Sequence, residues 1–211
     1  MCSSLLVLAA FALSAGPEEL PKALRGVTGA DSYSFTLRES PAAPALEAKY
    51  QKGVPVYFNA DRIEFFRKGD LLVYKQKDVW QRTRTGTLSD PLLILAASAK
   101  VRAARLPHEE LAVLGKALTN VKKTEAILSG EFKAEAAKQL ARSEDRDLAR
   151  GGTAKLWLNT DGRLVKYEIA IRVQGVRGNA EVDGVITRIV TIADLGKVKV
   201  EVPAGARKAL E

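Results

Sequence analysis

The fold is decided by residues 31–83, DSYSFTLRESPAAPALEAKYQKGVPVYFNADRIEFFRKGDLLVYKQKDVWQRT. Apolar residues alternate with polar ones in short runs along this stretch, as at Tyr33, Phe35 and Leu37. Period-two alternation is typical of antiparallel strands with one buried face. The segment RKGD at residues 67–70 has the composition of a hairpin turn, with glycine available for a positive φ. The stretch therefore predicts a meander of short strands.

A Leu- and Ala-rich stretch with helical spacing follows, from Ser89 to about Arg150. The sequence Ser-Asp-Pro at residues 89–91 predicts a helix start, with capping side chains followed by proline in the first turn. The next six residues, Leu92 to Ala97, are all apolar. A helix without a polar face must be surrounded, so we expect this one to be enclosed by protein or ligand.

The remaining elements are predicted from the same signals. They are a short helix over residues 20–25, a helix from Pro107, a strand-like segment 121–132, a helix 134–148 that ends at Gly151, a hairpin around residues 160–163, and strands over 164–173, 182–192 and 198–202. Strands, then helices, then strands again predict an α+β fold. One sheet with helices against one face would form a concave apolar enclosure.

Composition narrows the class of protein. The 211 residues carry a formal charge of +8, which favours anionic partners. The basic residues are scattered and no nucleic-acid-binding motif is present, so we expect no nucleic acid partner. The single cysteine (Cys2) and single histidine (His108) exclude an internal disulfide and argue against a transition-metal site. No nucleophile elbow or phosphate-binding loop is found, so we expect neither a cofactor nor an enzyme.

The N-terminus has the pattern of a secretory signal. Residues 3–16 carry no charge, and they are too few to span a bilayer. Small residues precede Pro17, although the usual basic segment is missing; a packed N-terminal helix is the alternative. Only Met1 precedes Cys2, which therefore lacks a lipidation motif. We expect residues 1–16 to be a signal peptide or its remnant and residues 17–211 to form one exported, soluble domain.

Three segments resemble a known family. They are Tyr33-Ser34-Phe35 at the first strand, the Trp157-containing hairpin KLWLNTDGRLVK at residues 155–166, and the ending TIADLGKVKVEVP at residues 191–203. With the order of elements over residues 20–211, they resemble the bacterial lipoprotein-carrier fold, a group that includes LolA and the LppX/LprG-like lipid-binding lipoproteins.

The resemblance implies a strongly curved antiparallel sheet, an unclosed β-barrel, with helices covering or plugging its concave face. It also implies a periplasmic protein whose cavity receives acyl chains of a lipid or a lipidated protein. The chain departs from the lipoprotein members by lacking a lipidation motif, so the resemblance does not extend to a membrane anchor.

The candidate lipid-binding residues are the apolar side chains expected to face the cavity. They are Tyr33, Phe35, Leu37, Tyr50, Phe58, Phe65, Val73 and Trp80 from the strands, with Leu92, Leu93, Leu95 and Leu111 from the helices opposite. For any single residue, plain core packing is the alternative. Burial of an acyl chain needs no specific polar contact. Replacing Leu93 by Glu is expected to abolish acyl uptake.

Polar candidates are fewer. Arg142, Arg146 and Arg150 recur every fourth residue and would stack along one face of the expected helix. They are interpreted as a solvated face or, alternatively, as contacts to lipid head groups or an anionic membrane surface. We expect His108 to lie exposed at a helix start, and Glu109 and Glu110 to be ordinary first-turn acids.

These observations favour an exported monomeric carrier of lipid or acylated protein. A different class fits the same half-barrel, namely a protein-interaction or envelope-stress sensing domain. An apolar hollow between sheet and helices would favour the carrier. An interior already filled by the protein's own side chains would count against lipid transport, and such an interior together with a stable protein partner would favour the sensing domain.

Overall fold

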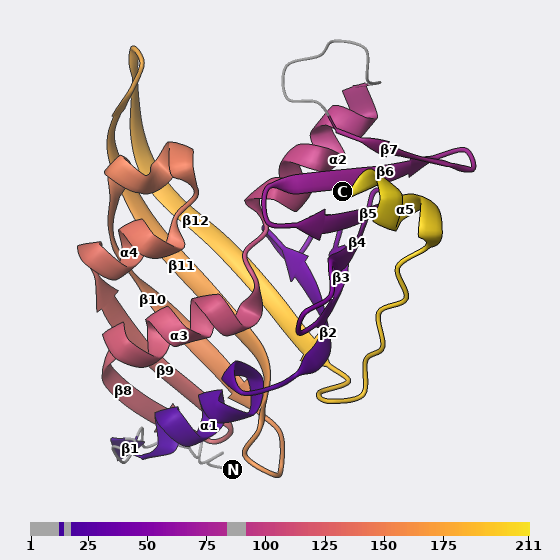
Figure 1. The fold of residues 1–211 in the computed structure, drawn as a ribbon. Helices are drawn as coiled ribbons and strands as arrows, with labels where there is room; N and C mark the ends of the chain where they lie inside the picture. Colours follow the sequence, from indigo (N-terminus) through magenta and orange to yellow (C-terminus); the bar gives the residue numbers. More distant parts are fainter. Residues whose placement is uncertain (1–12, 15–17, 84–91) are drawn as a thin grey trace, which may run out of the picture.

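The computed structural model describes residues 13–14, 18–83 and 92–211 (Figure 1). The strands in chain order are β1 (Leu13–Ser14), β2 (Ser32–Arg38), β3 (Leu46–Gln51), β4 (Val56–Ala60), β5 (Ile63–Lys68), β6 (Leu71–Gln76), β7 (Val79–Arg82), β8 (Thr119–Thr124), β9 (Ile127–Lys133), β10 (Ala149–Leu158), β11 (Leu164–Arg177) and β12 (Ala180–Ala193). The helices are α1 (Glu19–Thr28), α2 (Leu92–Ala103), α3 (Pro107–Ala117), α4 (Ala134–Leu140), the 3-10 helix η1 (Ser143–Leu148) and α5 (Ala204–Ala209).

The described strands form one antiparallel sheet in the order β1-β8-β9-β10-β11-β12-β2-β3-β4-β5-β6-β7. One end of the sheet is formed by β1 and its neighbour β8, and the other end is β7. These two ends do not pair with each other within the described residues, so the sheet is unclosed. The strand direction changes between strands β8–β12, of which β10, β11 and β12 are long, and strands β2–β7, which gives the sheet two halves (Figure 1). The predicted α+β fold with an unclosed sheet is therefore confirmed.

The helices divide between the two halves. Helices α1, α3 and α4 lie over the β8–β12 half, where α4 contacts β9 and β10 and α1 contacts β11 (Figure 1). Helix α2 contacts β4 and β5 in the other half. Inward-facing side chains of both halves and of these helices form one continuous apolar core, the main cluster. A second cluster lies between β5, β6 and α5 and contains Phe66, Val73, Val200, Ala206 and Leu210.

The local patterns explain most of these elements. In β2 the predicted alternation holds, because Tyr33, Phe35 and Leu37 are buried while Ser34 and Thr36 are partly exposed. The turn at residues 67–70 joins β5 to β6, and Gly69 has a φ of 57° there. A residue with a side chain adopts this conformation rarely.

The structure corrects three expected elements. Residues 134–148 are not one helix: α4 ends at Leu140, Arg142 is extended with φ −65° and ψ 161°, and η1 follows. Gly151 lies in β10 at a register shift rather than at a helix end. Residues 198–202 are not a strand; the backbone N–H of Val200 donates to the side chain of Gln51 at 2.8 Å instead of joining the sheet.

The N-terminal helix and the segment 121–132 differ less from expectation. The helix is longer than expected and continues past Gly26 to Thr28. The segment 121–132 falls into two strands, β8 and β9, which form a hairpin. The expected helix start at residues 89–91 lies outside the described residues. In the region expected to be a signal peptide, Leu13 and Ser14 pair with Lys123 and Lys122 at the edge of the sheet.

Candidate functional site

Most of the strand residues expected to face a cavity belong to the main cluster. Tyr33, Phe58, Phe65 and Leu111 are fully buried, Phe35 and Leu37 are nearly so, and Tyr50 packs against them. Phe35 and Phe58 meet edge to face with 6.3 Å between their ring centroids. The structure thus brings these residues together between sheet and helices. Their near-zero exposure means that protein side chains already fill the space around them, so the open apolar hollow expected there is not found between these described residues.

Two candidates lie elsewhere. Val73 belongs to the second cluster, and Trp80 packs against that cluster with its ring centroid 5.3 Å from that of Phe66. These two side chains therefore face α5, on the side of the sheet away from the main cluster. The reason is that β6 is buried on both faces, with Leu72 in the main cluster and Val73 in the second. Period-two reasoning identifies the two faces but not which one lines the interior.

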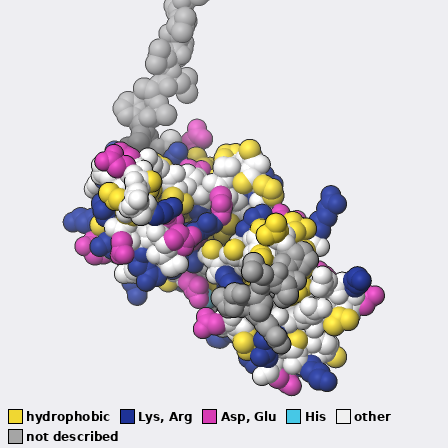
Figure 2. Space-filling view, turned by 90° about the horizontal axis from the view of Figure 1, so that it is seen from above, with side chains coloured by type: hydrophobic (Ala, Val, Ile, Leu, Met, Phe, Trp, Pro, Cys, Tyr) yellow, Lys and Arg dark blue, Asp and Glu magenta, His cyan; other side chains and the backbone are white. Residues whose placement is uncertain are grey.

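The first turn of α2 also differs from expectation. Leu92 and Leu93 are 83% and 58% exposed, and Leu95 is partly exposed. The buried face of the helix is formed by Ile94, Ala97 and Val101. Hydrophobic side chains gather on the molecular surface near the start of α2 (Figure 2). The expectation that this helix is enclosed on all sides is therefore wrong, and its first turn presents an apolar surface.

A hollow of about 400 Å³ lies between the two halves of the sheet and is lined by Glu39, Arg142 and residues of β12. Strand β12 pairs with β2 only over Ile189 to Ala193. Its residues from Ala180 to Arg188 pair with β11 alone, so this part of β12 is an edge facing the other half. We call this hollow, lined by the free edge of β12 and the start of the β2–β3 loop at Glu39, the gap.

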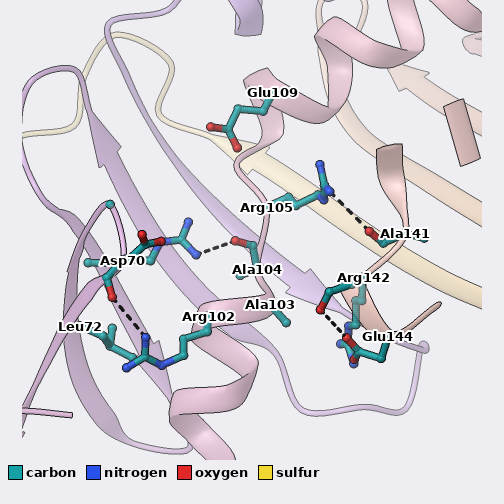
Figure 3. Close-up of a pocket in the computed structure, with 13 residues that line it drawn as sticks. Asp70, Leu72, Arg102, Ala103, Ala104, Arg105, Glu109, Ala141, Arg142 and Glu144 are labelled. Carbon is teal, nitrogen blue, oxygen red and sulfur yellow. Dashed lines mark hydrogen bonds between the residues drawn. The ribbon is translucent and has the colours of Figure 1, made fainter. Parts of the chain in front are cut away.

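The connection between α2 and α3 (residues 104–106) lies beside the gap and has a pocket on each flank. One pocket, of about 150 Å³, is lined by Leu37, Leu46, Pro44 and the buried Arg188 together with Ala103 and Ala104. A larger pocket of about 480 Å³ shares Ala103, Ala104 and Arg142 with it and is drawn in Figure 3. Leu37 and Leu46 belong to the main cluster. The smaller pocket therefore leads from the surface directly onto the apolar interior.

Arginine side chains fix the end of α2 to β5 and link the two sides of the gap. Arg67 of β5 donates through one nitrogen to the carbonyl oxygens of Val101 and Ala104, each at 2.7 Å, and so fixes the end of α2. Its guanidinium also stacks 4.8 Å from the ring centroid of Phe58. Across the gap, Arg142 forms an ion pair with Glu39.

The three arginines predicted to stack on one helix face do not do so. Arg142 lies between α4 and η1, Arg146 within η1, and Arg150 in β10. Of the three, Arg142 lines both pockets beside the α2–α3 connection. Arg150 donates to the carbonyl oxygen of Asp147 at 2.7 Å on the surface.

Sequence reasoning missed a buried polar group at the centre of the interior. Glu110 of α3 is fully buried, pairs with Arg188 of β12 and accepts a hydrogen bond from the hydroxyl of Tyr167 at 2.7 Å. Burial raises the pKa of Tyr167 well above its usual value, so this hydroxyl remains a donor. Arg188 also donates to the carbonyl oxygen of Leu140 at the end of α4. Glu110 is therefore not an ordinary first-turn acid. A lone arginine in the apolar run VITRIVTIA at residues 185–193 was the available signal.

His108 is likewise not a surface residue. It is half-buried, and its Nδ1 lies 2.6 Å from the hydroxyl oxygen of Tyr33. Its ring packs against that of Tyr50 with 4.6 Å between centroids. Burial lowers the pKa of His108 and raises the pKa of Tyr33, so the hydrogen bond joins a neutral imidazole to a neutral hydroxyl. This bond fixes the start of α3 to β2.

The described residues contain neither a helix that could span a membrane nor a cluster of metal-binding side chains. No helix there is both long enough and apolar enough to cross a membrane. The same residues contain no group of three or more His, Cys, Asp or Glu side chains placed to hold a metal ion.

Comparison with known proteins identifies the fold. No family model and no curated protein matches this chain. The structure is similar to the crystal structure of LprF from Mycobacterium bovis, with a TM-score of 0.55, 13% sequence identity, and coverage of 90% of this chain and 96% of that chain. LprF belongs to the LppX/LprG group, so the likeness supports the predicted resemblance to that group at the level of fold and does not single out LolA. The chain therefore has the LprF fold.

Proposed function

We propose that this protein is an exported carrier that binds the acyl chains of a lipid or of a lipidated protein between the sheet and α2. The observation that supports this most directly is the small pocket at the gap, because its floor of Leu37 and Leu46 is part of the main cluster. An acyl chain entering there would meet Leu37 and Leu46, with Arg188 of the buried ion pair beside it. The likeness to LprF supports the fold that such binding needs.

Binding requires the interior to open, because it is filled in this structure. Burial of each methylene gains ~0.8 kcal/mol, so twelve methylenes would gain roughly 10 kcal/mol before the cost of opening. Helix α2 is the element to move. Its end is held by the two Arg67 hydrogen bonds, while its first turn has Leu92 and Leu93 exposed. An acyl chain could replace the contacts that Ile94, Ala97 and Val101 make with the sheet.

Blocking the entrance tests this proposal. Ala103 lines both pockets, whereas Ala96 lies two turns earlier on α2, exposed and outside them. We expect Ala103→Trp to reduce binding of a fluorescent fatty acid at least tenfold and Ala96→Trp to leave it within twofold of the unmodified protein. Circular dichroism checks that both variants fold. Equal binding by all three proteins, or no binding by the unmodified one, would overturn the assigned site.

Leu93→Glu adds a second test, which asks whether the exposed turn of α2 takes part in uptake. Because Leu93 is exposed, the variant should fold normally. Slower uptake with unchanged affinity at equilibrium would assign Leu93 to the route of entry rather than to the bound state.

A second function has a specific observation in its favour. The filled interior and the exposed Leu92 and Leu93 also suit a protein-interaction or envelope-stress sensing domain. Organic extraction of protein purified from its own envelope separates the two. Stoichiometric acyl species support the carrier, whereas a stable protein complex free of acyl species supports the sensing domain.

A further inference from the structure

The larger pocket beside the α2–α3 connection is rich in arginines. It lies where the end of α2, the β5–β6 turn and the α4–η1 segment meet (Figure 3). Its volume of about 480 Å³ is within the range of small-molecule sites, roughly 300–1,000 Å³. Four arginines, at positions 67, 102, 105 and 142, line it together with Asp70, Glu109 and Glu144.

Three of these arginines have no ion-pair partner among the residues that the structure describes. Arg67 donates to the carbonyls of the α2 end, Arg102 to Asp70 O at 3.2 Å and to the Thr83 hydroxyl, and Arg105 to Ala141 O at 3.4 Å. A guanidinium has five N–H donors, so each keeps donors that these bonds do not use. Burial lowers the pKa of Arg67 and of Arg105, which shows that their charges are partly removed from water.

The acids of the pocket differ from the arginines in their exposure. Asp70, Glu109 and Glu144 are all exposed, whereas Arg67, Arg105 and Arg142 are only partly so. Charges in water are screened and act weakly on their neighbours. The Glu109 carboxylate accepts the backbone N–H of Leu106 at 3.3 Å, and Glu144 accepts from Ser143. The inner wall of the pocket is therefore formed by arginines. Among the acids, Glu109 acts on Arg67 and Arg105, because its charge opposes the lowering of their pKa by burial.

We propose that this pocket binds the anionic head group of the lipid, a phosphate or sulfate ester, through Arg67, Arg105 and Arg142. This rests on the proposed function, because the pocket shares Ala103 and Ala104 with the smaller pocket through which the acyl chains would enter. Guanidinium groups bind such esters through paired N–H donors. A head group at Arg142 would compete with Glu39 and weaken the ion pair across the gap.

Two lipids with the same acyl chains test the inference. Dipalmitoylphosphatidylglycerol carries a phosphodiester and dipalmitoylglycerol carries no charge. We expect the protein to bind the first at least tenfold more tightly, measured by native mass spectrometry and by displacement of a fluorescent fatty acid. Arg105→Gln should reduce this preference to less than about threefold while leaving dipalmitoylglycerol binding unchanged. Arg172→Gln is the control, because Arg172 is exposed on β11 and does not line the pocket.

The outcomes separate this inference from the proposed function. Equal binding of both lipids by the unmodified protein would overturn the head-group site and leave acyl binding intact. An unchanged preference in Arg105→Gln would also overturn the site. If the protein binds sn-glycerol 3-phosphate but neither of the two lipids, the pocket is an anion site and lipid carriage is overturned. Failure to bind any of the three would overturn both.

Discussion

Glu110 of α3 and Arg188 of β12 form an ion pair inside the protein, with side-chain exposures of 0% and 8%. The pair joins a helix over the β8–β12 half to the strand that borders the gap. A buried pair is costly to break, because removing one partner leaves the other charged and unpaired away from water. This contact therefore fixes the position of α3 relative to β12.

The first prediction follows from this pair. Glu110→Gln and Arg188→Met should each lower the free energy of unfolding by about 3 kcal/mol. The double variant should lose clearly less than the sum of the two, because neither charge is then left unpaired. Urea unfolding followed by circular dichroism measures the free energy of unfolding of the unmodified protein, the two single variants and the double variant. Additive losses would show that the two side chains are not coupled.

The second prediction concerns pH and His108. Burial holds its pKa below the ordinary 6.5, so the unfolded chain binds a proton on acidification before the folded protein does. The free energy of unfolding therefore falls as the pH drops through 6.5 and below. His108→Gln removes this contribution and should flatten the curve of unfolding free energy against pH between pH 7.5 and 5. If the unmodified protein and His108→Gln give parallel curves of unfolding free energy against pH, the prediction is wrong.

The third prediction compares two strand glycines. A Cβ at Gly152 in β10 would clash with the carbonyl oxygen of Ala170 and with the ring of Phe132, whereas a Cβ at Gly184 in β12 meets nothing within 4 Å. Gly152→Ala should cost about 3 kcal/mol or more, and Gly184→Ala should stay within ~1 kcal/mol of the unmodified protein. Thermal unfolding measures both. Similar melting temperatures would mean that β10 relaxes easily at Gly152.

The fourth prediction tests the docking of α5. A Cβ at Gly205 would lie 2.9 Å from Cδ1 of Trp80, whereas one at Gly26 of α1 meets nothing within 4 Å. Alanine is favoured over glycine in helices by ~1 kcal/mol. Gly26→Ala should therefore stabilise the protein. Gly205→Ala should destabilise it and change the fluorescence of Trp80, read in a Trp157→Phe background. Stabilisation by both substitutions would show that α5 shifts freely on the sheet.

Some features were predictable because they depend on residues close together in the chain. The alternation at Tyr33, Phe35 and Leu37 indicated a strand with one buried face, and the structure has that strand. Proline at position 107 followed by two glutamates indicated the start of α3. The hairpin around Gly162, which has a φ of 73°, followed from its Asn-Thr-Asp-Gly sequence.

The predictions that were wrong concern segments where local preference was overruled. Residues 134–148 were predicted to form one helix, yet α4 ends at Leu140, whose carbonyl oxygen accepts a hydrogen bond from Arg188. Leu92 and Leu93 are apolar but exposed, and Val73 is buried against α5 rather than in the main cluster. Nothing within a few residues of these positions specifies which neighbour will cover them.

The sequence by itself determined the α+β class, most strand positions and the start of α3, because backbone preference and side-chain periodicity act over a few residues. Only the tertiary structure decided that Glu110 meets Arg188, that β12 leaves part of its edge free, and that arginines from β5, α2 and the α2–α3 connection surround one pocket. These contacts join residues far apart in the chain. They are set by how the sheet bends and by which helix packs on which half, and short-range patterns carry no information about either.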